Sequence, residues 1–168
     1  MRIITDRLRL EPITAAHGPE LHRLHLDPAI APWWDVDWSL EDAAAQAAAF
    51  AEGWAHDGVS KWLAYDRATG ELLGRGGMTR VHLEGAARLE VGWAIVGTHW
   101  GQGYATEIGR ASLAFAFDHL GASEVVAFTE PHNVRSRAVM ERLGMTYRRD
   151  IDHDGYRFVL YTCAAPEG

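Results

Sequence analysis

The segment Trp100 to Glu107 joins two glycines to the predicted start of a helix. Glycine lets the main chain turn tightly and approach a ligand closely. The first N–H groups of a helix lack partners within the helix, and the helix dipole makes that end positive. This combination suits a diphosphate group held by main-chain donors. A tight strand-to-helix connection without a ligand is the alternative, whereas a dinucleotide fingerprint is disfavoured because Thr106 replaces its third glycine.

The hydrophobic patterns on either side of this turn differ. Before it, alternating and helical patterns predict a strand at 8–10, helices at 14–26 and 43–54, and strands at 62–65, 72–81 and 89–96. After it, they predict a helix at 104–120, a strand at 124–129, a helix at 133–143, and two strands around 154–155. This order predicts an α/β (α+β) fold with a mixed, mostly antiparallel sheet flanked by helices. Such a sheet offers a ligand cleft where neighbouring strands separate.

Capping residues predict where two of these helices begin and end. Thr14 is a suitable N-cap for the first helix, and Ser39 followed by Asp42 is a capping pattern for the second. Gly53 and Gly58 are predicted to mark the end of the second helix.

Composition narrows the class of protein. The 168 residues suit a single domain spanning 1–168, and the formal net charge of −7 disfavours nucleic acid as a partner. No apolar run approaches the ~20 residues of a membrane span. The single cysteine, Cys163, excludes an internal disulfide and a CxxC metal site. His22 and His25 lack a third ligand, so no metal is expected. A cytoplasmic location and no membrane partner follow as expectations.

Five segments together resemble the GNAT superfamily of N-acetyltransferases, and specifically its RimJ/RimL-like branch of ribosomal-protein N-terminal acetyltransferases. They occur in the family's order, at 5–10, 89–93, 100–107, 133–136 and 141–145. The resemblance implies a GNAT-type acyl-CoA N-acyltransferase fold. It also implies transfer of an acetyl group from acetyl-CoA to a primary amine by direct attack in a ternary complex.

The resemblance implies a set of cofactor-binding residues. The backbone of the turn is expected to hold the pyrophosphate, and the strand before it to present edge groups to the pantetheine arm. Asn133 is expected to bond the same arm, although a plain N-cap role is the alternative. The implied set is Trp93, Ala94, Ile95, Val96, Gln102, Gly103, Tyr104, Ala105, Thr106, Asn133 and Ser136.

Glu90 and Ser136 are the leading candidates for proton chemistry, and His132 and the cluster Asp152-His153-Asp154 are secondary ones. Amines are largely protonated at pH 7, so a base or a water chain must remove a proton. Glu90 is the first candidate because it points opposite to Leu89 and Val91, and a structural role is its alternative. Many family members protonate the leaving thiolate with a tyrosine. Here Met140 occupies that position, so Ser136 is the nearby substitute, or a stabiliser of the developing charge.

The segment 33–38 is the candidate acceptor site. Its tryptophans and carboxylates favour a cationic amine, with Trp33, Trp34, Asp35 and Trp38 as binding residues. The alternative is that this cluster covers a sheet edge or forms a homodimer contact. The acceptor is expected to be a peptide N-terminus or a small amine. Two other functions compete with this one. The domain could be a non-catalytic sensor that binds acyl-CoA, or it could bind another phosphate-bearing ligand.

Overall fold

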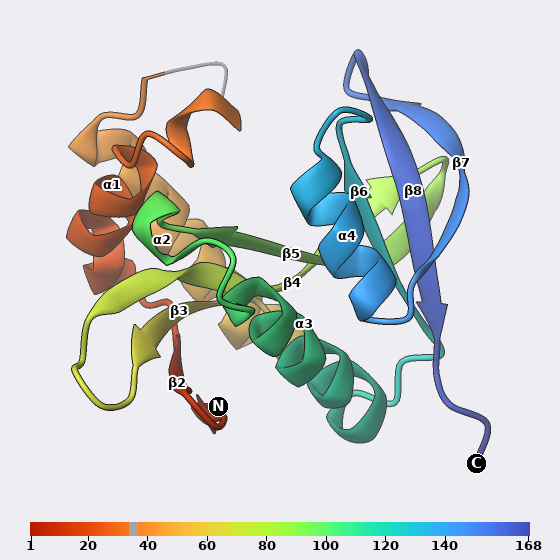
Figure 1. The fold of residues 1–168 in the computed structure, drawn as a ribbon, viewed down its shortest axis with the longest axis horizontal. Coiled ribbons are helices and arrows are strands. Elements are labelled where there is room, and N and C mark those ends of the chain that lie inside the picture. The colour runs from red at the N-terminus through yellow and green to blue at the C-terminus, as the bar shows by residue number, and fades with distance from the viewer. Residues whose placement is uncertain (34–36) are drawn as a thin grey trace.

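One eight-stranded sheet organises the protein (Figure 1). The computed structural model describes residues 1–33 and 37–168. Along the sheet the strands follow the order β1-β2-β3-β4-β5-β6-β8-β7. Their bounds are β1 Ile3–Ile4, β2 Leu8–Pro12, β3 Lys61–Asp66, β4 Leu72–Leu83, β5 Ala86–Ile95, β6 Glu124–Thr129, β7 Thr146–His153 and β8 Tyr156–Ala164. The predicted mixed, mostly antiparallel sheet is confirmed, because β5–β6 is the parallel pair among antiparallel neighbours.

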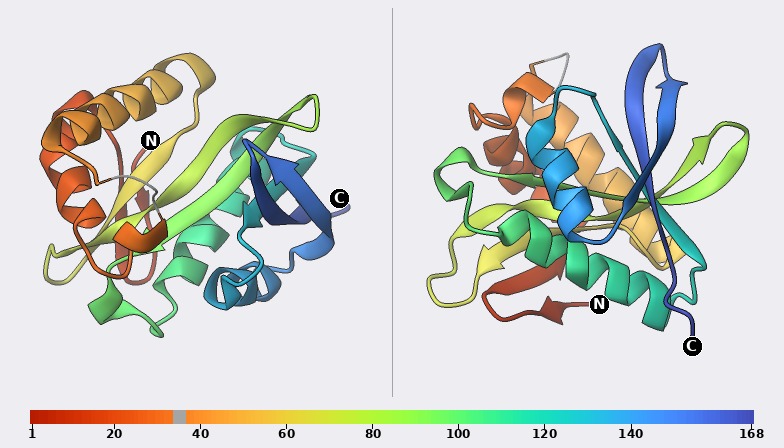
Figure 2. Two further views of the ribbon diagram at one scale, coloured as in Figure 1. Left: turned by 90° about the horizontal axis from the view of Figure 1, so that it is seen from above. Right: turned by 45° about the vertical axis from the view of Figure 1, so that its right-hand side comes forward.

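The parallel pair is also where the sheet opens. β5 and β6 pair at a single register position, Glu90 opposite Val126, and then diverge. In Figure 1, β6, β7, β8 and α4 (Val134–Arg142) lie on one side of the opening, β2 and β3 lie on the other, and β4 and β5 run across between them. Figure 2 shows the same separation from two further directions. Residues of both β5 and β6 line a cavity at this divergence, so the predicted cleft between separating strands is present in the fold.

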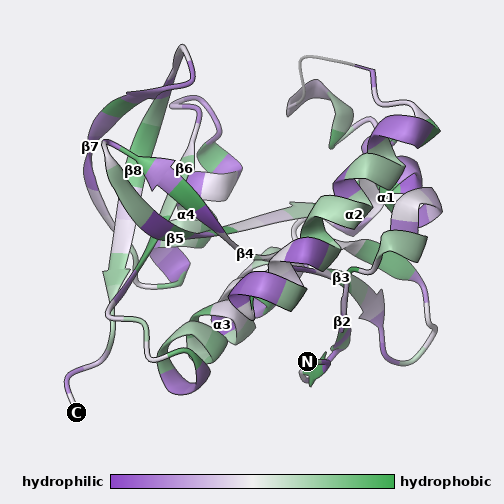
Figure 3. Ribbon diagram, turned by 180° about the vertical axis from the view of Figure 1, so that it is seen from behind, coloured by the Kyte–Doolittle hydropathy of each residue, from purple (hydrophilic) through white to green (hydrophobic). Residues whose placement is uncertain are grey.

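Helices cover both faces of the larger half of the sheet. α3 (Tyr104–Ala114) packs on one face, with Ile108 fully buried. A Cβ at Gly76 would lie 2.4 Å from Ile108 Cγ2, so this glycine allows α3 to approach β4. α1 (Gly18–His25) and α2 (Leu40–Asp57) cover the opposite face over an apolar cluster that includes Leu63. In Figure 3 the alanine-rich middle of α2 is drawn mostly in pale green, with hydrophilic residues toward its two ends.

The capping prediction for α2 is confirmed at its start. Ser39 Oγ accepts from the Asp42 N–H at 3.1 Å, and the Asp42 carboxylate accepts from the Ser39 N–H at 2.9 Å. At the other end Gly58 adopts φ +67° and stops the helix, but Gly53 lies inside it. A Cβ at Gly53 would lie 3.0 Å from Ser60 Oγ, so this glycine serves close packing on the chain that returns to β3.

Two predicted helices are irregular in the structure. The predicted helix 14–26 is a 3₁₀ turn, η1 (Ala15–His17), followed by α1, with Pro19 in the first turn of α1. The predicted helix 104–120 is α3 followed by a π turn, η4 (Phe115–His119). Two further 3₁₀ turns are η2 (Ala31–Trp33) and η3 (Gly97–His99). None of the helices among residues 1–33 and 37–168 is long and apolar enough to cross a membrane.

The buried ring of His25 makes stability sensitive to acid. It is 4% exposed and stacks on Trp38 at a centroid distance of 3.9 Å. The pKa of His25 is lowered to about 4, mainly because the ring is buried and to a lesser extent because Arg75 and His22 are nearby charges. Because the folded pKa lies below the unfolded value, the unfolded chain binds the extra proton. Stability is therefore complete above pH 6.5 and falls as pH drops toward 4.

We expect the free energy of unfolding to fall by about 2 kcal/mol between pH 7.5 and pH 5 on account of His25. His25→Phe keeps an aromatic ring against Trp38 and removes the titration. Urea unfolding at both pH values checks this, with exposed His56→Phe as the matched control. An unchanged pH dependence in His25→Phe would exclude His25 as its source.

Candidate active site

A cavity of about 1310 Å³ occupies the opening between β5 and β6. Its walls come from β3, β4, β5, β6, α2, α3, α4 and the turn before α3. It contains most of the residues predicted from the sequence and extends from the glycine turn to Glu90. One continuous space therefore connects the predicted phosphate-binding turn to the predicted base.

The glycine turn presents main-chain donors. Gly101 and Gly103 have φ of +75° and +82°, the left-handed region that favours glycine. Glu107 is the first residue of α3 whose N–H reaches a carbonyl, that of Gly103 at 3.0 Å. Within the described residues, the N–H groups of 102–106 donate to no protein acceptor. These donors at the positive end of α3 fit a diphosphate.

Side chains far away in sequence hold this turn in place. Arg7 Nη1 donates to the Gln102 carbonyl at 2.7 Å, and the Arg7 guanidinium lies 4.3 Å from the Tyr104 ring centre. Glu107 accepts from Arg7 Nε at 2.7 Å and from Thr5 Oγ1 at 2.6 Å. Burial opposes ionisation of Glu107, but these bonds keep its pKa below the usual value.

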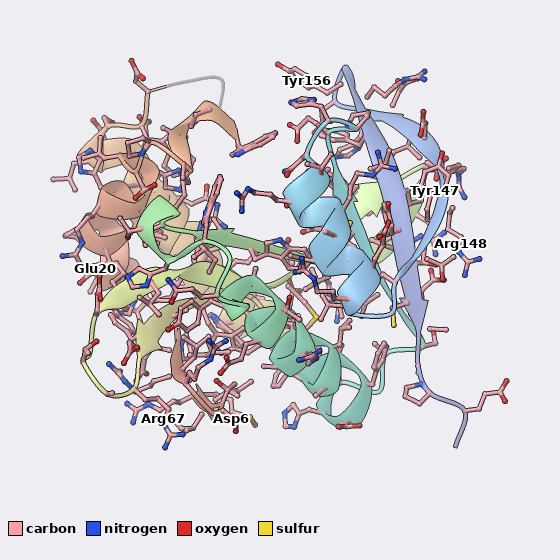
Figure 4. The ribbon with its side chains drawn as sticks, viewed as in Figure 1. Asp6, Glu20, Arg67, Tyr147, Arg148 and Tyr156 are labelled. Atoms are coloured by element: carbon pink, nitrogen blue, oxygen red, sulfur yellow. The ribbon has the colours of Figure 1, made fainter. Side chains whose placement is uncertain are left out.

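A second arginine fixes the segment that carries Arg7. Arg67 Nη1 donates to the carbonyls of Thr5 and Asp6 at 2.7 and 3.2 Å. Figure 4 labels Asp6 and Arg67 at the same edge of the molecule, near the N-terminus. Residues 5–10 were recognised from the sequence only as a family marker. Their role in supporting the turn depends on two long-range contacts, Arg7 with Glu107 at 100 positions apart and Arg67 with Thr5 at 62.

The edge of β5 offers alternate main-chain groups to the cavity. The Val96 N–H donates to the Leu73 carbonyl at 2.9 Å, so it faces β4 and is not available to a ligand. Along an antiparallel strand, the N–H and C=O groups of successive residues point to alternate sides. The main-chain groups of Ala94 therefore also face β4, and those of Trp93 and Ile95 face the opening. The Ile95 carbonyl accepts from Trp100 Nε1 at 2.8 Å. Trp93, Ala94 and Ile95 line the cavity, and Val96 lies outside its lining.

The first turn of α4 brings Asn133 and Ser136 to the opposite wall. Asn133 is the N-cap of α4: its Oδ1 accepts from the Ser136 N–H at 3.2 Å. Its Nδ2 donates to Thr129 Oγ1 at 3.0 Å, which ties the cap to β6. The N-cap reading is therefore confirmed, while both residues also line the cavity. Met140 is 2% exposed and lies deeper in the same wall.

Glu90 lies in a buried group of charges on the face opposite Leu89 and Val91, as predicted. Lys61 Nζ lies 3.6 Å from Glu90 Oε2 and donates to the Gly77 carbonyl at 3.0 Å. Thr79 Oγ1 lies 3.5 Å from Glu90 Oε2. Gly92 leaves room for the pair, because a Cβ there would lie 3.2 Å from Glu90 Oε1 and 3.3 Å from Lys61 Nζ.

Burial shifts both members of this pair toward their neutral forms. It raises the pKa of Glu90 against the opposing effect of the cations Lys61 and Arg75 and of a bond from Thr79. It lowers the pKa of Lys61 despite the nearby carboxylate. A carboxylate with a raised pKa, inside the cavity, has the properties of a general base. Lys61 was not among the predicted site residues, although it is the only lysine in the chain and begins an apolar strand.

The predicted acceptor residues separate in the structure. Trp33 lines the cavity and stacks on His132 at 5.4 Å, which joins η2 to the loop before α4. Trp38 packs on His25 and the core under α1 and α2, outside the cavity lining. Trp34 and Asp35 lie outside the described residues. Of this group, the described structure brings only Trp33 to the site.

Comparison with known proteins agrees with this geometry. A family model described as an acetyltransferase (GNAT) domain matches residues 7–146. A GNAT-family acetyltransferase structure from Bordetella pertussis is 26% identical, with a TM-score of 0.83 and coverage of 98% of this chain and 99% of that one. The RimL ribosomal L7/L12 α-N-protein acetyltransferase in complex with coenzyme A is 18% identical, with a TM-score of 0.81 and 98% coverage of both, and shows similarity of fold.

A curated relative from Aspergillus fumigatus, FsC-acetyl coenzyme A-N(2)-transacetylase, is 31% identical over 152 residues, which is 85% of this chain. The matches to it and to a Bacillus subtilis relative span 64% and 55% of those proteins' lengths. The family model covers most of the chain, and the similar solved structure from Bordetella pertussis shares the fold described above. The chain therefore belongs to the GNAT acetyltransferase family.

Proposed function

We propose that the protein is an N-acetyltransferase that moves an acetyl group from acetyl-CoA to a primary amine by direct attack in a ternary complex. The observation that carries this proposal is the continuity of the cavity, which runs from the unpaired amides of 102–106 to the Glu90 carboxylate. A diphosphate binder alone has no need for a buried carboxylate in the same space. Family membership supports the reaction class.

The cofactor is proposed to lie along the opening in the sheet. The amides of 102–106 bind its pyrophosphate, and Gly103 lets the backbone come close. The outward main-chain groups of Trp93 and the outward N–H of Ile95 pair with the amides of its pantetheine arm, as an added strand would. Ser136 and Asn133 line the other side of that arm.

The chemistry is proposed to use Glu90 and Ser136. Glu90, directly or through a water, takes the proton that the ammonium of the acceptor must lose. The amine nitrogen then bonds to the thioester carbonyl carbon, and the carbon–sulfur bond breaks. The nitrogen loses its second proton to solvent or to the departing thiolate, so the products are the amide and the free thiol of coenzyme A. Ser136 donates a hydrogen bond to the departing thiolate, which stabilises its charge without a full proton transfer.

The acceptor is proposed to be a protein N-terminus or a small amine. Trp33, which borders the cavity beside His132, provides an aromatic surface for a cationic group. The RimJ/RimL-like branch favours a protein N-terminus, whereas the name of the Aspergillus fumigatus relative describes acetyl transfer to an N(2) position. A homodimer and a cytoplasmic location, without nucleic-acid or membrane partners, stay predictions from the sequence.

The second candidate is a non-catalytic acyl-CoA sensor. It is favoured by Met140, which stands where many relatives carry a tyrosine acid and cannot give up a proton. Release of free thiol from acetyl-CoA, measured with a panel of peptide N-termini and small amines, separates the two. Turnover with any amine supports the enzyme. Tight coenzyme A binding with no turnover on the whole panel supports the sensor.

Ser136→Ala tests the proposed role of the hydroxyl. We expect kcat to fall about tenfold, while the Kd for coenzyme A stays within twofold, because the hydroxyl acts on the charge that develops late. The exposed Ser123→Ala is the matched control and is expected to behave as the wild type. A weaker Kd with unchanged kcat would assign Ser136 to cofactor positioning instead.

A further inference from the structure

In the proposed function, the turn before α3 binds the pyrophosphate with main-chain donors. Arg7 lies beside this turn, but its guanidinium already bonds to other groups of the protein. Arg7 bonds the Glu107 carboxylate and the Gln102 carbonyl, so its charge is balanced locally. A diphosphate carries negative charge that neutral amides alone do not compensate. A cation from another element would complete the site.

Arg135, in the first turn of α4, is placed to supply that cation. Its guanidinium lies 4.3 Å from the centre of the Trp100 ring, and Trp100 immediately precedes Gly101. Both residues line the cavity, on opposite sides of its opening. Among residues 1–33 and 37–168, no carboxylate pairs with Arg135. The aromatic ring orients the guanidinium without neutralising it.

Arg110 on α3 and Arg142 at the far end of α4 also line the cavity, and no carboxylate among residues 1–33 and 37–168 pairs with either. The Nη1 of Arg142 lies 3.5 Å from Thr106 Oγ1. Arg135 differs from both because its guanidinium rests on the ring of Trp100, the residue directly before the glycine turn.

We propose that Arg135, held on the ring of Trp100, reaches across the cavity to bind the cofactor's pyrophosphate. This inference rests on the proposed function, because it requires coenzyme A as the ligand. It assigns Trp100 the role of a platform.

Calorimetric titration of three ligands tests the assignment: coenzyme A, dephospho-coenzyme A and pantetheine. We expect Arg135→Ala to weaken coenzyme A about tenfold and dephospho-coenzyme A equally. Pantetheine, which lacks phosphate, is expected to bind as to the wild type. Arg148→Ala removes the same charge from β7, at the far edge of the molecule in Figure 4, and is the matched control.

A double-mutant cycle tests the platform. Trp100→Leu removes the ring, and Trp100→Phe keeps a ring but loses the bond to the Ile95 carbonyl. We expect Trp100→Leu to weaken coenzyme A, Trp100→Phe to stay near wild type, and Trp100→Leu to add little in the Arg135→Ala background. Circular dichroism confirms that each variant is folded.

Three results would overturn the assignment. Unchanged coenzyme A affinity in folded Arg135→Ala excludes a cofactor contact. A penalty that vanishes with dephospho-coenzyme A moves Arg135 to the 3′-phosphate, away from the pyrophosphate. Additive effects of Trp100→Leu and Arg135→Ala exclude the platform. A wild-type protein that fails to bind coenzyme A at all would instead refute the proposed function.

Discussion

Gly103→Glu is expected to weaken coenzyme A binding by at least about a hundredfold, which removes measurable binding for most assays. Gly103 has φ +82°, so a side chain strains the turn. The Cβ would point toward Arg7, with Nη2 at 3.4 Å, which leaves physical room for the substitution. The effect therefore arises mainly because a carboxylate would lie among the amides that bind the pyrophosphate. Titration calorimetry measures the loss.

Two variants separate charge from backbone strain. Gly103→Ala imposes the same left-handed strain, of roughly 1 kcal/mol, without charge, and we expect it to weaken binding far less. Gly121→Glu makes the identical substitution at an exposed left-handed glycine that is remote from the cavity. Coenzyme A binding by folded Gly103→Glu within twofold of wild type would exclude this turn as the site.

Glu90→Gln is expected to lower kcat by about a hundredfold or more, because the amide cannot accept the proton from the acceptor ammonium. The side chain keeps its shape and its approach to Thr79, so we expect the Kd for coenzyme A to stay within threefold. Glu124→Gln, on the neighbouring strand and paired with Arg88, is the matched control.

The pH profile gives Glu90 a signature of its own. The base acts only when ionised, and burial raises its pKa. We therefore expect wild-type kcat to fall on the acid side at a higher pH than an ordinary carboxyl group would produce. Glu90→Gln should lack this acidic limb. If the variant keeps both kcat and the limb, Glu90 is a structural partner of Lys61 and a water chain deprotonates the acceptor.

Features that depend on neighbours in sequence were predictable. The glycine turn, the Ser39–Asp42 cap and the hairpin at Asp154-Gly155 each follow from a few adjacent residues, and the structure contains all three. The alternation of Leu89 and Val91 with Glu90 likewise indicated that Glu90 lies on the other face of β5, where Lys61 and Thr79 approach it.

Features that depend on distant contacts were not predictable. Glycine has two uses, and the sequence does not distinguish a helix-ending Gly58 from a close-packing Gly53. Glu107 acquires its role from Arg7, which lies 100 positions earlier. Trp38 belongs to the core because His25 folds back against it, a contact that composition alone does not reveal.

The chain contains one lysine, Lys61, and its side chain is almost wholly enclosed beneath Glu90. The other permanently charged basic residues are all arginines, whose guanidinium groups do not react with amine-selective esters. Amine-selective esters therefore find no exposed lysine side chain on this domain, and a lysine introduced at one chosen surface position would be the single side-chain amine open to a label.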